Sequence, residues 1–137
     1  WDTHDKHNDL LKRFLMPWMD QAYSALLTDL SDRGLLDETL VLWVGEFGHT
    51  PKFNARAGRD HWGHCFSIAL AGGGVQGGVV HGGSDDRAAY PISGRVEPRD
   101  LMATVFHCLG YSPDTELHDT SGRPLPISRG RVIEQVL

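Results

Sequence analysis

The chain has 137 residues, of which 40% are hydrophobic and 23% are charged, and its formal net charge is -5. This composition is close to that of an average globular protein, which excludes a disordered or collagen-like chain and predicts one domain or part of one. The acidic balance argues against a nucleic-acid binder, two cysteines are too few for a disulfide framework, and no apolar run approaches the roughly 18 residues that span a bilayer.

An amphipathic helix is predicted in the first quarter of the chain. Asn8 or Asp9 can cap its start, and Gly34 is a natural stop. Pro17 falls inside the pattern and is expected to kink or split the helix, because proline lacks an N–H and its ring crowds the preceding turn. The apolar residues at helical spacing are Leu10, Leu11, Phe14, Leu15, Trp18, Met19, Tyr23, Leu26, Leu27 and Leu30.

Two buried strands are expected after this helix. Residues 39–45 form a nearly continuous apolar run, which suits a strand covered on both faces in a parallel sheet. Residues 65–71 form a second such run. Residues 46–64 are polar and predict a long loop, of a length that is usually functional or disordered. The order of helix, strand, loop and strand indicates the α/β class.

A glycine-rich stretch follows the second strand. Residues 72–77 fit the pattern G-x-G-x-x-G, but dinucleotide binding by this motif requires a helix immediately after it. Residues 78–83 instead have the composition of a strand and a turn, with a short strand expected at 79–81. The better interpretation is a glycine-rich turn between two strands.

The last third of the chain predicts a loop, a helix and a weak strand. The loop covers residues 82–95, and the helix starts at Pro98 in its first position and ends at Gly110. The weak strand is expected at residues 131–136.

Histidine is the unusual component, with eight residues in the chain. Five of them lie in three short stretches that also carry acids, at residues 2–7, 46–49 and 60–64. If a strand precedes residue 1, the first helix is a crossover between parallel strands, and the first two stretches leave the same edge of the sheet. The third stretch reaches that edge if its strand runs antiparallel or if the long loop folds back. We therefore expect the three stretches to meet.

Imidazole and carboxylate together suit zinc, manganese or iron, whereas a set of carboxylates alone suits magnesium or calcium. The candidate metal ligands are Asp2, His4, Glu46, Asp60 and His61. Structural roles remain open for four of them. Asp2 and His4 can cap the first helix, Glu46 can be a solvated loop acid, and His61 can bond backbone groups of its loop. No single motif decides between the two interpretations.

Several motifs in this order resemble a known family. They are Trp1-Asp2-Thr3-His4, Gly45-Glu46-Phe47-Gly48-His49-Thr50-Pro51-Lys52, Gly58-Arg59-Asp60-His61-Trp62, Leu70-Ala71-Gly72-Gly73-Gly74, Pro98-Arg99-Asp100-Leu101 and Gly122-Arg123-Pro124. The series resembles the sulfatase-like family catalogued as domain of unknown function 1501 (DUF1501). That family is similar to the alkaline phosphatase superfamily of sulfatases, phosphodiesterases and phosphomutases, and the resemblance covers essentially the whole chain.

The resemblance implies an α/β/α sandwich with a large central sheet, of which residues 1–137 would be the C-terminal part. It also implies that the nucleophile comes from an N-terminal half that nothing here matches. Asp2 and His4 resemble the superfamily's aspartate–histidine pair, Glu46 its strand-end acid and His61 its last metal-binding histidine. Phe47 stands where a second histidine is expected, and His49 where the family usually shows arginine.

These features predict part of a metal-dependent hydrolase of phosphate or sulfate esters. Asp2, His4 and His61 would bind one divalent metal, zinc or manganese with calcium as an alternative, and Glu46 and Asp60 would bind or support a second. The expected partner is a small anionic ester, with no nucleic acid and no membrane span, and the resemblance implies export from the cytoplasm.

The alternative is a non-catalytic exported module that kept the fold and lost the chemistry. A third alternative is a structural fragment whose histidines contact solvent.

The missing nucleophile implies that residues 1–137 alone are inactive. The strand at residues 39–45 is apolar on both faces, so the chain by itself is expected to expose apolar surface and to self-associate.

Overall fold

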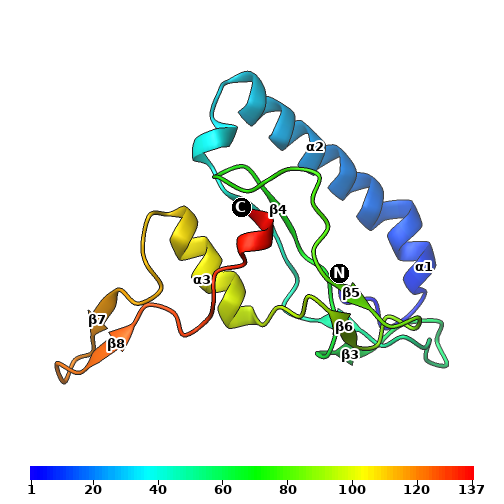
Figure 1. Ribbon diagram of the computed structural model, residues 1–137. Helices are drawn as coiled ribbons and strands as arrows, with labels where there is room; N and C mark the ends of the chain where they lie inside the picture. The colour runs from blue at the N-terminus through cyan, green and yellow to red at the C-terminus, as the bar shows by residue number, and fades with distance from the viewer.

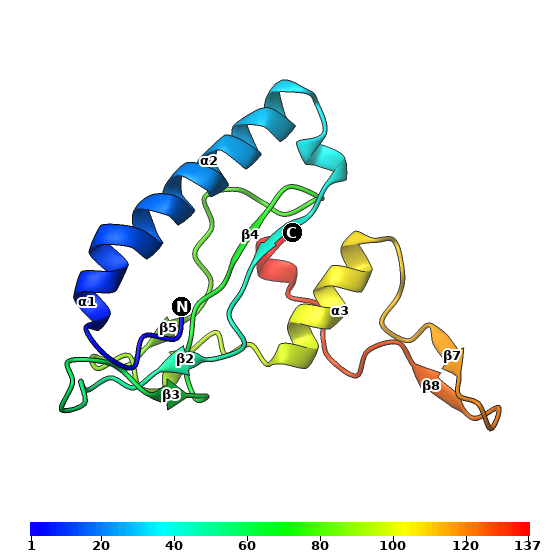
Figure 2. The same ribbon diagram turned by 180° about the vertical axis from the view of Figure 1, so that it is seen from behind.

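One long helical rod forms the upper edge of the molecule in the computed structural model, which describes residues 1–137 (Figures 1 and 2). It consists of helix α1 (His7–Leu10), a π-helical turn η1 (Leu11–Leu15) and helix α2 (Met16–Asp32). The rod starts at His7, and its N-cap is Lys6 in a left-handed conformation, two residues before Asn8, the earlier of the two predicted caps. None of the helices combines the length and the apolar composition that a membrane span requires.

Pro17 neither breaks nor splits this rod. The turn before it widens, so that the backbone N–H of Met16 bonds the carbonyl of Leu11, five residues earlier. Because proline has no N–H and its ring crowds the carbonyl four residues back, a π-helical turn directly before it relieves the crowding within a continuous helix.

Gly34 ends the rod, as the sequence predicts. Its φ of 67° is left-handed, a conformation that glycine adopts at no steric cost. The N–H of Gly34 bonds the carbonyl of Ser31, and the N–H of Leu35 bonds that of Leu30. This pair of bonds is a Schellman motif, which satisfies carbonyls at the helix end that would otherwise lack donors.

The two predicted buried strands pair with each other. Strand β1 (Val41–Trp43) runs antiparallel to strand β4 (Ala69–Ala71), with Leu42 opposite Leu70. The sequence predicted that β1 lies in a parallel sheet. This prediction is wrong, because β4, the partner of β1 in the structure, is antiparallel. The antiparallel direction of β4 brings the segment before it back to the edge where β1 ends, which is one of the two arrangements that the sequence left open.

The glycine-rich stretch after β4 is a turn and is followed by no helix. Gly72 lies so close to the short 3-10 helix η2 (Leu36–Glu38) that a Cβ there would stand 2.3 Å from the carbonyl oxygen of Leu36. These glycines therefore allow two backbone segments to touch, and they do not present the helix N-terminus that a bound dinucleotide requires.

Three further two-stranded antiparallel sheets complete the strands. They are β2 (Gly48–His49) with β3 (His61–Trp62), β5 (Gly83–Ser84) with β6 (Pro91–Ser93), and β7 (Glu116–His118) with β8 (Pro124–Pro126). Both predicted long loops thus contain a small sheet. The strand expected at 79–81 is absent, because the chain pairs only from residue 83. The strand expected at 131–136 is also wrong, since this segment ends in a 3-10 turn, η3 (Glu134–Val136).

Helix α3 (Pro98–Cys108) contains the most deeply buried part of the molecule. Pro98 occupies its first turn as predicted, and Glu97 and Asp100 form a reciprocal capping box. Thr104 is almost fully buried; its hydroxyl donates to the carbonyl of Asp100 and accepts the N–H of Ile133. The C-terminal segment is thereby held against α3.

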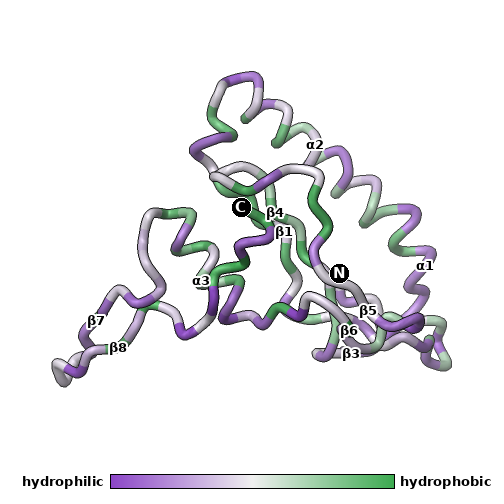
Figure 3. The backbone as a smooth tube through the Cα atoms, in the orientation of Figure 1, coloured by the Kyte–Doolittle hydropathy of each residue, from purple (hydrophilic) through white to green (hydrophobic).

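The fold is therefore mixed α/β, as the order of elements predicted. It shows four separate two-stranded sheets and no α/β/α sandwich with a large central sheet. The apolar segments gather at β1 and β4, between the rod and α3, and the β7–β8 hairpin extends away from the rest of the chain (Figures 1 and 3).

Candidate metal centre

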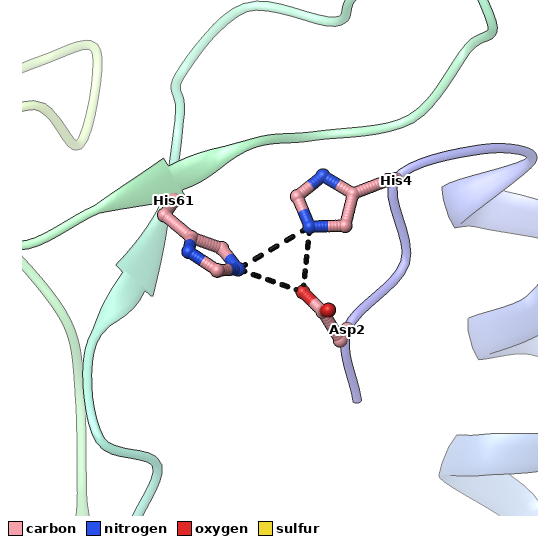
Figure 4. Close-up of side chains that lie close together, drawn as sticks. All are labelled: Asp2, His4 and His61. Carbon is pink, nitrogen blue, oxygen red and sulfur yellow. Dashed lines mark hydrogen bonds and ion pairs between the residues drawn. The ribbon is translucent and has the colours of Figure 1, made fainter.

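Asp2, His4 and His61 point their ligand atoms at one another (Figure 4). Oδ1 of Asp2 lies 2.8 Å from Nε2 of His4 and 2.9 Å from Nε2 of His61. The two imidazole nitrogens are 3.2 Å apart. Two residues from the N-terminal segment thus meet one from β3, 57 or more positions later in the sequence.

Backbone pairing holds the N-terminal segment in this position. The N–H groups of Lys6 and His7 bond the carbonyls of Arg56 and Ala57, and the N–H of Arg59 bonds the carbonyl of Thr3. We call this pairing of residues 3–7 with residues 56–59 the clasp. These bonds fix the position of His4 without a bound metal.

Gly58 makes the clasp possible. A Cβ at this position would lie 2.0 Å from the carbonyl carbon and oxygen of His4, which is far inside van der Waals contact. Only glycine lets the two backbones approach this closely.

The β2–β3 sheet places the third ligand. His61 lies opposite His49 in this sheet, and the ladder continues where the N–H of Thr50 bonds the carbonyl of Asp60 at 2.8 Å. Side chains alternate between the faces of a strand, so His61 can reach the cluster while Trp62 turns elsewhere and donates its indole N–H to the carbonyl of Ala89.

Asp60 supports His4 from behind and is not one of the three converging ligands. Its Oδ1 lies 3.0 Å from Nδ1 of His4 and also accepts a hydrogen bond from the Asn54 amide. The same amide nitrogen is within hydrogen-bond distance of the His4 carbonyl. Asp60 and Asn54 therefore fix both the orientation of the His4 ring and the backbone that carries it.

Electrostatics within the cluster favour a bound cation. A carboxylate only accepts, so Nδ1–H of His4 donates to Asp60 and, in the neutral ring, Nε2 presents a lone pair to the Asp2 carboxylate. The hydrogen bond between His4 and Asp60 is the main cause that raises the pKa of His4. The hydrogen bond between Asp2 and His61 is the main cause that lowers the pKa of Asp2. A proton or a metal ion is needed between these groups.

The chemistry of the donors fits a divalent metal. In a tetrahedral site with metal–ligand distances of about 2.0–2.1 Å, neighbouring ligand atoms lie roughly 3.3 Å apart, close to the separations of the three atoms here. A ligating histidine also typically donates its other N–H to a carboxylate, as His4 does to Asp60. Two nitrogens and one oxygen suit zinc or manganese better than magnesium or calcium.

Glu46 does not take part in this group. It follows β1 at an exposed position and makes no hydrogen bond or ion pair in the structure. Its neighbour Phe47 contacts the cluster instead, with its ring 4.6 Å from that of His61. An apolar ring thus lies where the resemblance implies a second histidine.

Sequence reasoning did not identify Asn54. Its Oδ1 accepts the N–H groups of Arg56 and Gly58, so this side chain organises the loop turn as well as Asp60. The signal was an amide residue four positions before a glycine in a polar loop, which is typical of side chains that bond the backbone of a turn.

Comparison with protein families gives one result for this chain. The family model described as "Protein of unknown function (DUF1501)" matches residues 1–137. No curated protein and no solved structure matches the chain.

Proposed function

Because the chain belongs to the DUF1501 family, whose function is unknown, we propose its function from the geometry of the site. Asp2, His4 and His61 bind one divalent metal ion, zinc or manganese. The chain is the metal-binding C-terminal part of a hydrolase of phosphate or sulfate esters, and β1 and β4 belong to the larger sheet of an α/β/α sandwich that the resemblance implies.

The convergence of three ligand atoms, two of them imidazole nitrogens, carries this proposal. Exposed acids gather often without a metal, but the Asp60–His4 pair adds a feature that solvation does not require. It fixes the ring so that Nε2 faces Asp2 and His61.

A metal bound here would act as a Lewis acid toward an ester oxygen. The chain's own residues have simpler tasks. Asp60 holds the proton on Nδ1 of His4, Asn54 holds Asp60, and the Phe47 ring covers one side of His61. Asp2 and His61 remain about half exposed or more, so an anionic substrate can approach from solvent.

A specific observation favours a second candidate function, a non-catalytic exported module with a single metal. Phe47 lies against His61 where a second metal-binding histidine is implied. Glu46, the acid expected to support a second metal, stands outside the cluster. One metal without a second would weaken any two-metal chemistry.

Calorimetric titration of Zn²⁺ and Mn²⁺ into the chain tests the metal site. We expect one equivalent to bind, with His61→Ala weakening the affinity at least tenfold. His118→Ala serves as the control because His118 lies on the exposed β7 strand of the projecting hairpin. Binding no tighter than about 1 mM (roughly -4 kcal/mol), or equal loss in the two variants, would contradict the proposal.

Activity separates the hydrolase from the module. Hydrolysis of aryl phosphates and aryl sulfates by the full-length protein, lost in chelator and restored by metal, is the expected result for the enzyme. Metal binding without any such activity supports the module instead.

A further inference from the structure

A second polar site lies away from the metal cluster, where the segment before α3 meets the C-terminal segment. It is a cavity of about 340 Å³ lined by six residues, none of them hydrophobic. Its lining consists of Arg95, Glu97, Arg99, Asp100, Arg129 and Arg131. We call it the arginine pocket.

The formal charge of the arginine pocket is opposite in sign to that of the rest of the molecule. Four guanidinium groups and two carboxylates give it a formal charge of +2. The remaining residues include nine basic and sixteen acidic side chains, a formal charge of -7. A cationic hollow in an acidic chain concentrates field lines on a small anion.

The two carboxylates of the pocket are already engaged. Both oxygens of Asp100 accept backbone N–H groups, those of Glu97 and Arg131, at 3.0 and 2.9 Å. Glu97 pairs with Arg99 at 2.7 Å and more loosely with Arg95 at 3.6 Å. Arg129 and Arg131 have no ion pair or side-chain hydrogen bond of their own, so their guanidinium groups are free to bind a ligand.

Backbone contacts hold the two arginine segments together. A Cβ at Gly130 would lie 2.0 Å from the carbonyl oxygen of Arg99, and the Ser128 hydroxyl donates to the same carbonyl. Arg129 and Arg131 flank this close approach. Their position beside Arg99 is therefore set by the fold and needs no ligand to assemble it.

The helix N-terminus offers few free donors, because Pro98 has no N–H and the capping box pairs the N–H groups of Glu97 and Asp100. The guanidinium groups are the donors. Arginine binds phosphate-like oxygens through paired N–H groups, and the absence of apolar lining residues excludes a ligand with a large hydrophobic part. A cavity of this size has room for the charged group of a small ligand, whereas an acidic protein segment needs an extended strip.

We propose that the arginine pocket binds a tetrahedral dianion, the phosphate or sulfate group of a small ligand, through Arg129 and Arg131 with Arg95 and Arg99 beside them. Arg95 also lines a smaller hollow with Gly63 and His64, which directly follow β3. The proposal does not require the metal site, and Arg95 is the one residue that the two hollows share.

Calorimetric titration of inorganic phosphate and of sulfate, in EDTA and at constant ionic strength, tests this proposal. We expect saturable binding that the double substitution Arg129→Gln, Arg131→Gln weakens at least tenfold. Both side chains are exposed, so the variant should fold, which circular dichroism checks. The control, Arg13→Gln with Arg87→Gln, removes the same charge from two exposed arginines elsewhere and should bind like the wild type.

The anion that binds more tightly identifies the source, a phosphate or a sulfate group. The proposal is overturned if neither anion saturates the chain or if the two double variants lose equal affinity. It is also overturned if an acidic peptide binds through Arg129 and Arg131 while both small anions fail. Because EDTA is present throughout, failure here leaves the metal proposal standing, and loss of metal binding leaves this one standing.

Discussion

His4 shows at the scale of single residues how a metal ligand is prepared before a metal arrives. One ring nitrogen is held by Asp60 and the other faces Asp2 and His61. A free imidazole would rotate among several orientations, and the carboxylate removes that freedom. The cost of orienting the ligand is met on folding, so it does not reduce the affinity for the metal.

Asp60→Asn is expected to weaken zinc binding 10- to 100-fold, because the carboxylate orients His4 and raises the basicity of its ring. Calorimetry or competition with a chromophoric chelator measures the change. Asp86→Asn is the matched control, since Asp86 is an exposed loop acid without a hydrogen bond in the structure. Equal affinities for the two variants would show that Asp60 does not position the ligand.

The sequence indicated most of this site at the residue scale. Asp2, His4 and His61 were named as ligands, and the structure brings them together. Asp60 was placed around a second metal position, yet it bonds His4, because spacing along the chain does not reveal which acid stands behind a ring. Asn54 was missed since its role depends on a turn that folds back over residues 4 and 60.

Elements formed by local signals were the easiest to predict. Gly34 and Pro98 act within one or two turns of their own helix, so their effect can be read directly from the sequence. The two-residue strands β2 and β3 carry no such signal, because their paired residues are 12 and 14 positions apart in the sequence. The direction of β4 was open for the same reason.

Gly58→Ala tests whether the clasp positions the metal ligands. A Cβ at this position overlaps the His4 carbonyl, so the backbones must separate. We expect a loss of about 1–3 kcal/mol in the free energy of unfolding, together with at least tenfold weaker zinc binding, measured by chemical denaturation and calorimetry. Gly63→Ala is the control, because a Cβ there meets nothing within 4 Å. Unchanged zinc affinity in the Gly58 variant would contradict the role of the clasp.

The α3 cap predicts a pH-dependent contribution to stability. Burial raises the pKa of Asp100, but the backbone N–H groups of Arg131 and Glu97 outweigh it, and the net pKa lies below the usual 3.8. The charged form is therefore favoured on folding. Its contribution is present above pH 3.8 and is lost as the pH falls through the lower folded-state pKa.

Asp100→Asn should therefore lower the free energy of unfolding by about 1–3 kcal/mol near neutral pH, because the amide leaves one of the two N–H donors unpaired. Denaturation series at several pH values measure this difference. It should shrink at the acidic end, where the wild-type carboxyl is protonated. A difference that is constant with pH would count against this account of the cap.

The whole molecule exposes more surface than its size explains. A compact protein of 15.2 kDa has about 7,100 Å² of accessible surface, and this chain has 9773 Å². Only 9 of 137 residues are buried. Leu42, Trp43 and Val44 are 38–50% exposed at the end of β1, which is the apolar run that the sequence predicted to be covered on both faces.

Sedimentation velocity should therefore show self-association of the chain at micromolar concentration, driven by this apolar surface. Leu42→Lys should reduce the association. Ile92→Lys, which places the same charge on the exposed and separate β6 strand, should reduce it less. A strictly monomeric wild-type chain over this range would refute the prediction.

At this scale the sequence predicted the mixed α/β class but not how its strands pair. Helices and turns follow from residues close together in the chain, whereas a sheet is completed by whichever strands are available to pair. The apolar pattern of residues 39–45 predicts a strand that is covered on both faces. It does not indicate which segment of the protein covers it.

The clasp joins two of the three metal ligands to the loop that leads to the third. Opening residues 3–7 away from residues 56–59 would carry Asp2 and His4 away from His61 in one step. An ion held by all three side chains would oppose that opening by mass action. Metal binding is therefore expected to slow amide hydrogen exchange in the N-terminal segment. A metal ion at the surface would in this way stabilise the start of the long helix.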